Sequence, residues 1–340
     1  MKNILIVSYS FIAALIGAGF ASGSEILGYF TIFGRNGIWG IFFFAAVCAV
    51  FLFAVFSLCR KYHAYSFDEL LEAAGDRRIM RAIRGFTAVF SFCVFSAMLS
   101  AIGEGLGYFG IPPRTGACVA AIMCAILLSS GTARALDLNG IAGILLTAAV
   151  ITCCLYILRY REHHAYSSLT PAIGSAAAYS GYNLCSSLPV LAVLSRRLRT
   201  RADTAAAALI SACAVLIMMG LMFSILSMYH GRIPLGELPM LTLAARQNPV
   251  FAAIYCFVII TASSTTLTAS GSSILETIGK NRSFLYPAVL SSLGFLVSGF
   301  GFTGLVNTVY RICGIAGIPV MLYILYLYYV SIKNNDFKSK

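Results

Sequence analysis

Small and polar residues interrupt an apolar stretch near the N-terminus. The sequence IGAGFASGSE covers residues 16–25, with three glycines and two serines before Glu25. Glycine tolerates unwound backbone, which at membrane depth offers carbonyl oxygens to a cation and N–H groups to an anion. We therefore favour a helix that is broken here to hold a solute. The residues that would contact this solute are Gly17, Ala18, Gly19, Ala21 and Ser22.

Two other interpretations of this stretch compete with the broken helix. Lys2, the apolar run after it and the small residues FASG are typical of a signal peptide with its cleavage site. The apolar sequence continues past the glycines as ILGYFTIF, however, which argues against cleavage. Small residues also let transmembrane helices pack closely, and Gly17, Gly19 and Gly23 could serve that purpose alone.

A second stretch is dense in hydroxyl groups. The sequence TASSTTLTASGSS, residues 261–273, contains nine serines and threonines within an apolar region. Such side chains often bond to the backbone of their own helix or to a neighbouring helix. Hydroxyl and carbonyl oxygens are also hard ligands that suit a small cation such as sodium. The density of hydroxyls favours a cation site.

Two glutamates and an arginine lie within apolar stretches. A charged side chain at membrane depth is costly, so it must face a cavity, find a partner or change its protonation state. Glu104 is a candidate for binding a substrate ammonium group or for carrying a proton, unless it simply meets water at the outer interface. Glu25 is a second proton-coupling candidate, or else a helix cap. Arg311 could neutralise either carboxylate.

The composition is that of a polytopic membrane protein. The 340 residues are 59% hydrophobic and 11% charged, against roughly 25% charged in soluble domains. The net charge of +12 comes from basic residues in short loops, which indicates membrane topology rather than nucleic-acid binding. Ten spans are expected, at approximately 3–31, 37–59, 82–109, 115–132, 139–158, 170–195, 204–229, 248–276, 283–301 and 303–332.

The distribution of Lys and Arg predicts the orientation. Far more of them fall on the side of the membrane that holds the N-terminus, so both termini should be cytoplasmic. Residues 66–75 of the largest cytoplasmic loop predict a short amphipathic helix capped by Ser66. Residues 233–246 are too short to cross the membrane and predict a helix lying on its surface.

The chain divides into two halves of five spans, approximately 1–160 and 165–332, within a single transmembrane domain. Five is odd, so the halves have opposite topology. The leading span of the second half also contains an interruption, YSGYN at 179–183. Paired interruptions of this kind indicate a transporter's binding site, which adds Tyr179, Ser180, Gly181 and Asn183 as substrate contacts. The predicted fold is all-α, with ten transmembrane helices in a 5+5 inverted repeat and broken first and sixth helices.

The first-span sequence GAGFASGSEILGYFTIFGRNGIWG resembles the opening of the YkvI-type bacterial membrane proteins. That group belongs to the amino acid–polyamine–organocation superfamily, whose fold is LeuT-like. The resemblance implies a sodium site formed by the carbonyls of Ala13, Ile16 and Ala262 and the hydroxyls of Thr265 and Thr266. It also places a substrate carboxylate on the N–H groups of Gly17-Ala18-Gly19, and it implies a bacterial inner membrane.

These observations predict a cation-coupled secondary transporter that moves an amino acid or a similar small organic solute by alternating access. Sodium is the expected coupling ion, and no other cofactor is expected. One alternative is proton coupling through Glu104 or Glu25, and another is a nutrient receptor that binds without transport. An enzyme is disfavoured, because no HExxH, GxSxG or paired intramembrane aspartates occur.

Overall fold

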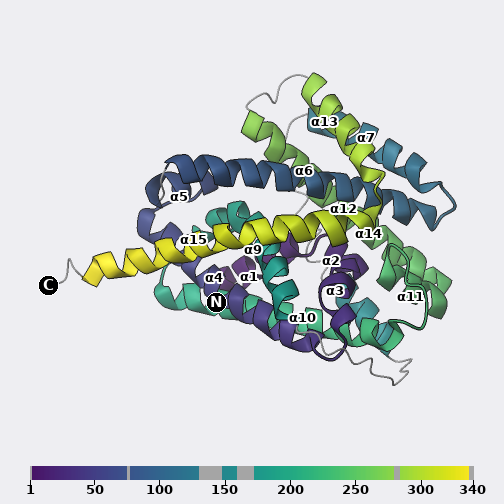
Figure 1. Cartoon of the computed structure of the whole chain (residues 1–340), viewed down its shortest axis with the longest axis horizontal. Helices are drawn as coiled ribbons and strands as arrows, with labels where there is room; N and C mark the ends of the chain where they lie inside the picture. The colour runs from purple at the N-terminus through teal and green to yellow at the C-terminus, as the bar shows by residue number, and fades with distance from the viewer. Residues whose placement is uncertain (1, 75–76, 130–147, 159–171, 279–283, 337–340) are drawn as a thin grey trace.

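The computed structural model describes the chain except for residues 1, 75–76, 130–147, 159–171, 279–283 and 337–340. The described residues form helices joined by short turns (Figure 1). The helices before the central gaps are α1 (Lys2–Leu15), α2 (Ala18–Ser22), α3 (Ser24–Tyr29), the 3₁₀ turn η1 (Thr31–Phe33), α4 (Gly37–Tyr62), α5 (Phe67–Ala74), α6 (Arg77–Gly107) and α7 (Pro113–Ser129). Those after them are α9 (Ile173–Ser195), α10 (Arg201–Tyr229), α11 (Pro239–Gln247), α12 (Pro249–Ile278), α13 (Leu285–Ser298), α14 (Phe302–Gly304), the π-helical turn η2 (Leu305–Val309) and α15 (Tyr310–Asp336).

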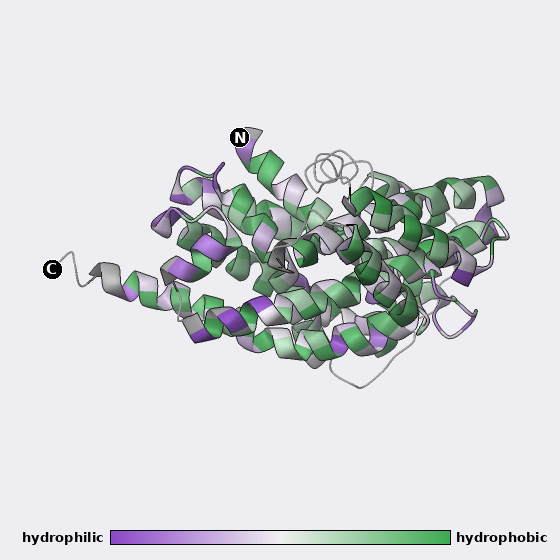
Figure 2. Cartoon of the chain, turned by 90° about the horizontal axis from the view of Figure 1, so that it is seen from above, coloured by the Kyte–Doolittle hydropathy of each residue, from purple (hydrophilic) through white to green (hydrophobic). Residues whose placement is uncertain are grey.

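Five of the described helices are long and apolar enough to cross a membrane. They are Gly37–Tyr62, Arg81–Gly107, Arg201–Tyr229, Pro249–Leu275 and Phe302–Lys333. Shorter apolar helices cover Asn3–Leu15, Pro113–Ser129, Ala148–Leu158 and Leu285–Ser298. Figure 2 shows hydrophobic residues over most of the bundle and hydrophilic residues gathered mainly toward the two ends of its long axis. The predicted fifth span, 139–158, lies partly outside the described residues.

The helices pack in two groups. In one group α4 contacts α9 and α10, and α1 contacts both α9 and α10. In the other group α6, α7, α12 and α13 contact one another. Among the described residues, contacts also pair four helices of the first half with helices of the second: α1 with α9, α4 with α10, α6 with α12 and α7 with α13. This pairing is the arrangement expected for an inverted repeat.

Two short helices outside the spans form where the sequence predicts them. α5 begins after Ser66, whose Oγ accepts a hydrogen bond from the Glu69 N–H at 3.1 Å, as an N-cap does. α11 lies within 233–247 and buries Met240, Leu243 and Ala244. It packs on α12 and on α2, so it covers the bundle at the end opposite α5 (Figure 1).

The prediction of a broken sixth helix is wrong. α9 runs without interruption from Ile173 to Ser195, through Tyr179, Ser180, Gly181 and Asn183. Gly181 serves close packing instead, because a Cβ added there would overlap the carbonyl oxygen of Gly314 on α15. The Ser180 hydroxyl donates to the Ala176 carbonyl at 2.8 Å, which satisfies it within the helix.

The tenth span carries the second irregular segment instead. It starts after Gly301, whose φ of 79° lies in the left-handed region, and passes from α14 through η2 into α15. Single π-helical turns are rare in proteins and are often found at functional sites. Asn307 lies within this turn, and Arg311 lies at the beginning of α15.

Candidate solute and cation site

The first helix is interrupted at Ile16 and Gly17, between α1 and α2. The Gly17 N–H donates to the Leu15 carbonyl at 3.0 Å, so it does not complete the helical bond to Ala13. α2 starts again with Gly17 as its N-cap, in extended backbone conformation. Among the described residues, no backbone N–H bonds to the carbonyls of Ala13 or Ile16. The break therefore frees the two carbonyls that the resemblance assigns to a cation.

A second interruption follows at Gly23, where φ is 82°. The carbonyl of Ala21 accepts a hydrogen bond from the Tyr255 hydroxyl of α12 at 2.5 Å. The Ser22 hydroxyl donates to the Gly19 carbonyl at 3.1 Å. Side chains thus satisfy part of the backbone that the two breaks leave unpaired, and they tie α2 to α12.

One set of serine and threonine hydroxyls in α12 bonds its own helix, while others, Thr266 and Ser272 among them, have no hydrogen-bond partner among the described residues. The first set donates to backbone carbonyls three or four residues earlier, and comprises Thr261, Ser263, Ser264, Thr265 and Thr268. Thr266 has no hydrogen-bond partner within the described part of the chain. Its Oγ1 lies 3.9 Å from the position that a Cβ would take at Gly17. Thr266 therefore presents a free hydroxyl to the break in the first helix, while Thr265 contacts the carbonyl of Ala262 at 2.9 Å.

Glu25 is buried at the start of α3, with 5% of its surface exposed. Its Oε2 accepts a hydrogen bond from the Tyr179 hydroxyl of α9 at 3.2 Å. Its Oε1 lies so close to Gly19 that a Cβ there would overlap it. The carboxylate thus lies on the glycine-rich segment itself, and only glycine leaves room for it.

Tyrosine rings surround the position of Glu25. The ring centroid of Tyr29 lies 5.3 Å from that of Tyr179 and 5.7 Å from that of Tyr182, and Tyr182 also contacts Tyr310 of α15 at 5.3 Å. Phe90 of α6 packs on Tyr182 and on Tyr310, at 5.6 Å from each. The cluster joins α3, α6, α9 and α15, so it lies where the two helix groups meet.

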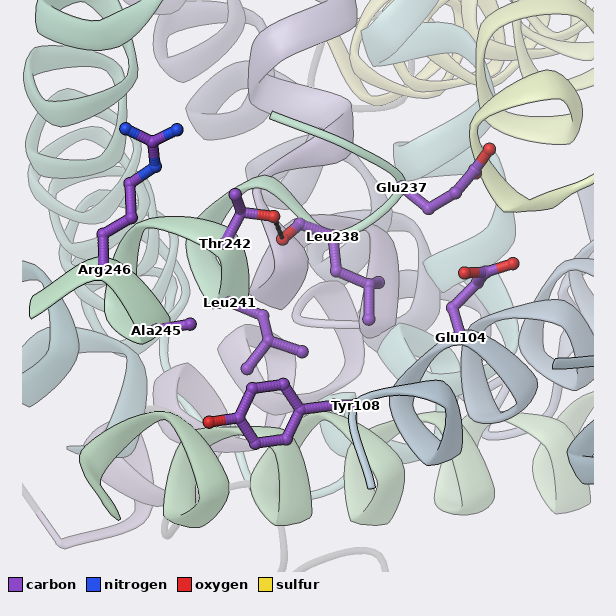
Figure 3. Close-up of a pocket in the computed structure, with 8 residues that line it drawn as sticks. All are labelled: Glu104, Tyr108, Glu237, Leu238, Leu241, Thr242, Ala245 and Arg246. Carbon is purple, nitrogen blue, oxygen red and sulfur yellow. Dashed lines mark hydrogen bonds between the residues drawn. The ribbon is translucent and has the colours of Figure 1, made fainter. Parts of the chain in front are cut away.

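Glu104 lies in a different place, a separate cavity of about 440 Å³. Figure 3 shows Glu104 and Glu237 at one end of this cavity and Arg246 of α11 at the other. The Glu237 carboxylate also accepts a hydrogen bond from the Thr303 N–H of α14. The carbonyl of Glu237 accepts one from the Ser24 hydroxyl at 2.7 Å. The cavity is therefore bounded by a loop that contacts both the first and the tenth span.

The structure brings together part of the residue set predicted from the sequence. Gly19 meets Glu25, which bonds Tyr179, and Gly17 lies near Thr266, whereas Gly181 faces α15. Ala18 and Ala21 are buried in α2, and Asn183 is buried in α9. The sequence analysis missed Tyr29, Asn307, Tyr310 and Glu237. Asn307 and Tyr310 precede Arg311 in VNTVYR, and a polar run within an apolar span was the signal available for them.

Comparison with solved structures identifies this arrangement. A mutant of the manganese transporter of Eremococcus coleocola superposes with a TM-score of 0.61 at 14% identity, over 94% of this chain and 78% of that one. A Na+-coupled sialic acid symporter gives 0.60 at 15% identity, over 95% and 77%. MhsT in complex with L-phenylalanine gives 0.63 at 14% identity, over 95% and 88%. The chain has the LeuT-like fold.

At these sequence identities the similarity shows a shared LeuT-like fold, and it does not show a shared substrate. No protein-family model matches the sequence, and no curated protein matches it. Membership of the YkvI-type group therefore stays a prediction, whereas the LeuT-like architecture and the multi-pass membrane character are established.

Proposed function

We propose that this protein is a secondary transporter that couples a cation, sodium in the first instance, to movement of a small organic solute across a bacterial inner membrane. The observation that carries the proposal is the break at Gly17, which lies beside Thr266, a hydroxyl of α12 without a partner among the described residues. The LeuT-like fold of a sodium-coupled symporter and of MhsT supports it.

The proposed cation ligands are oxygens that the fold leaves available. The carbonyls of Ala13 and Ile16 are free of backbone bonds within the described chain, and the Thr266 hydroxyl is free to turn its lone pairs toward them. Thr265 donates its proton to the carbonyl of Ala262, which leaves the lone pairs of the Thr265 hydroxyl oxygen free. Such a set of neutral oxygens suits a hard monovalent cation. A cation bound there would stabilise the interrupted conformation of the first helix.

The two helix groups provide the moving parts of the proposed cycle. α1, α4, α9 and α10 would rock against α6, α7, α12 and α13, with the interrupted first span between them. Because α2 packs on α12 while α1 packs on α9 and α10, the cation would bridge the two groups. Its binding would favour one of the two arrangements, which is the basis of coupling.

The proposal is tested by thermal unfolding of the purified protein in sodium and in potassium. A ligand that binds only the folded state at one hundred times its Kd stabilises it by about 2.7 kcal/mol. We expect sodium to raise the Tm of the wild type, and Thr266→Val to abolish the increase. Thr261→Val is the matched control, because Thr261 is exposed on the same helix and bonds its own backbone. An undiminished sodium response in Thr266→Val contradicts the cation site.

Proton coupling is the second candidate, and the burial of Glu25 favours it. A carboxylate that is 5% exposed and accepts a hydrogen bond from a phenol can take up a proton in place of a cation partner. Solute uptake into proteoliposomes distinguishes the two. Uptake that requires an inward proton gradient, ignores sodium and is lost in Glu25→Gln supports the proton; uptake that requires sodium supports the first proposal.

A further inference from the structure

The buried carboxylate of Glu25 and the partly buried guanidinium of Arg311 contact the same tyrosine cluster without forming an ion pair. Glu25 bonds to Tyr179, whose ring contacts that of Tyr29 at 5.3 Å. The guanidinium of Arg311 lies 5.4 Å from the centroid of the Tyr29 ring, and it donates to the Gly28 carbonyl at 2.9 Å. Within the described residues, neither charge belongs to an ion pair. Buried charges are costly unless they are paired.

The same region contains several buried polar atoms without hydrogen-bond partners. Among the described residues these include the hydroxyls of Tyr29, Tyr182 and Tyr310, Asn307 Oδ1 and Arg311 Nε. The three tyrosines are at most 3% exposed. Buried polar groups almost always have a partner, so this concentration indicates a molecule that belongs among them. The phenols and the guanidinium can donate to a carboxylate, and Asn307 Oδ1 and Glu25 can accept from an ammonium group.

The position of Glu25 determines how such a molecule is oriented between its ammonium group and its carboxylate group. Its carboxylate lies against Gly19, within the glycine-rich segment of the first span. Two carboxylates at that place would repel each other strongly in a buried environment. The carboxylate of the solute must therefore lie at Arg311, whose fork of donors suits it, and the ammonium group must lie at Glu25.

We propose that Glu25 and Arg311 bind the two ends of a small zwitterionic solute, with its ammonium group at Glu25 and its carboxylate at Arg311. The site is completed by Asn307 in the π-helical turn of the tenth span, rather than by a break in α9. Asn307 Oδ1 lies directly against Gly28, the residue whose carbonyl Arg311 binds. The inference rests on the proposed transport function and gives it a solute class and a binding polarity.

The test uses the full-length protein in detergent and the Tm as readout. The twenty protein amino acids are screened one by one in sodium, and the one that raises the Tm most is compared with its decarboxylated amine and its deaminated acid. We expect Glu25→Gln to weaken binding of the amino acid and of the amine at least tenfold. We expect Arg311→Gln to weaken binding of the amino acid at least tenfold and to leave binding of the amine unchanged.

Controls separate this inference from the proposed function. The sodium response of each variant reports on folding and on the Thr266 site, and it should persist in both. Arg311→Lys keeps the positive charge and should retain part of the amino acid response. Arg114→Gln removes an arginine that packs on Phe295, and it should change nothing. The inference is overturned if the amino acid binds both variants as tightly as the wild type, or if the deaminated acid binds the wild type as tightly as the amino acid does. It is also overturned if sodium raises the Tm of the wild type but no amino acid raises it further. A wild type that ignores sodium contradicts the cation site instead.

Discussion

In α12, two neighbouring threonines differ in whether their hydroxyl bonds the helix itself or is left free as a candidate ligand. Thr265 and Thr266 are neighbours of the same residue type, yet one donates to its own helix and the other does not. The difference follows from their direction, because Thr266 lies against the interruption of the first helix. The density of hydroxyls in the sequence predicted a cation site in this helix. Only the structure distinguishes Thr266 from the neighbouring hydroxyls that bond their own helix.

Glu69 gives a prediction at the residue scale for the loop that the charge distribution predicts to be cytoplasmic. The Tyr65 N–H donates to its Oε2 at 2.7 Å, and this hydrogen bond lowers the pKa of the Glu69 carboxyl. The stabilisation of the start of α5 is therefore present above the carboxyl's unfolded pKa and is lost as the pH falls through its lower folded pKa. We expect the protection of the Tyr65 amide against hydrogen exchange to fall over that acidic range.

Two variants check this assignment. Glu69→Gln should remove the pH-dependent step in the protection of the Tyr65 amide. Glu72→Gln should keep the step, because Glu72 lies on the same helix but contacts Arg84 instead. A step of equal size in Glu69→Gln means that another group controls the start of α5.

At the scale of elements, glycines have two roles that the sequence does not separate. In the first span they permit the break at Gly17 and the left-handed turn at Gly23. In α9, Gly181 permits close approach to α15 and the helix stays intact. Both segments alternate small and polar residues, so the same pattern correctly predicted one break and wrongly predicted the other.

The packing role of Gly181 is open to direct measurement. Gly181→Ala places a Cβ against the backbone of Gly314, which cannot move without displacing α15. We expect a loss of about 1–3 kcal/mol, as for overpacked cores, measured as a lower Tm. Gly220→Ala on α10 has open space around the new Cβ, so it should be neutral or stabilising by up to about 1 kcal/mol. Equal effects of the two substitutions argue against close packing at Gly181.

The ends of the tenth span show why the remaining part of the candidate site could not be predicted. The ten-span pattern placed a boundary near residue 302, in a sequence with several glycines, and continued with an ordinary helix. No pattern of residues in this sequence predicts a π-helical turn. Asn307 and Arg311 were visible as polar residues in an apolar span, but their meeting with Gly28 depends on the packing of α3 against η2. Composition and apolar patterning predicted a polytopic helical membrane protein because the membrane imposes them, whereas the LeuT-like architecture was what the resemblance implied.

At the scale of the whole molecule, the charge distribution predicts which end faces the cytoplasm. Phe109 and Phe284 lie at opposite ends of the predicted topology and are 52% and 57% exposed. We expect Phe109→Cys to react with a membrane-impermeant maleimide in intact cells. Phe284→Cys should react only after permeabilisation, because it follows the basic loop that contains Lys280 and Arg282. The wild type, with its eleven cysteines, measures the background. The reverse labelling pattern contradicts cytoplasmic termini.

The loop before α11 links distant parts of the chain through one residue. The backbone carbonyl of Glu237 accepts a hydrogen bond from the Ser24 hydroxyl, and its carboxylate accepts one from the Thr303 N–H, so the first and tenth spans are both fastened to this loop through one residue. A movement of this loop away from the bundle would strain both hydrogen bonds at once. Under the proposed transport function, the cavity beside this loop should therefore open in one concerted step rather than in separate stages.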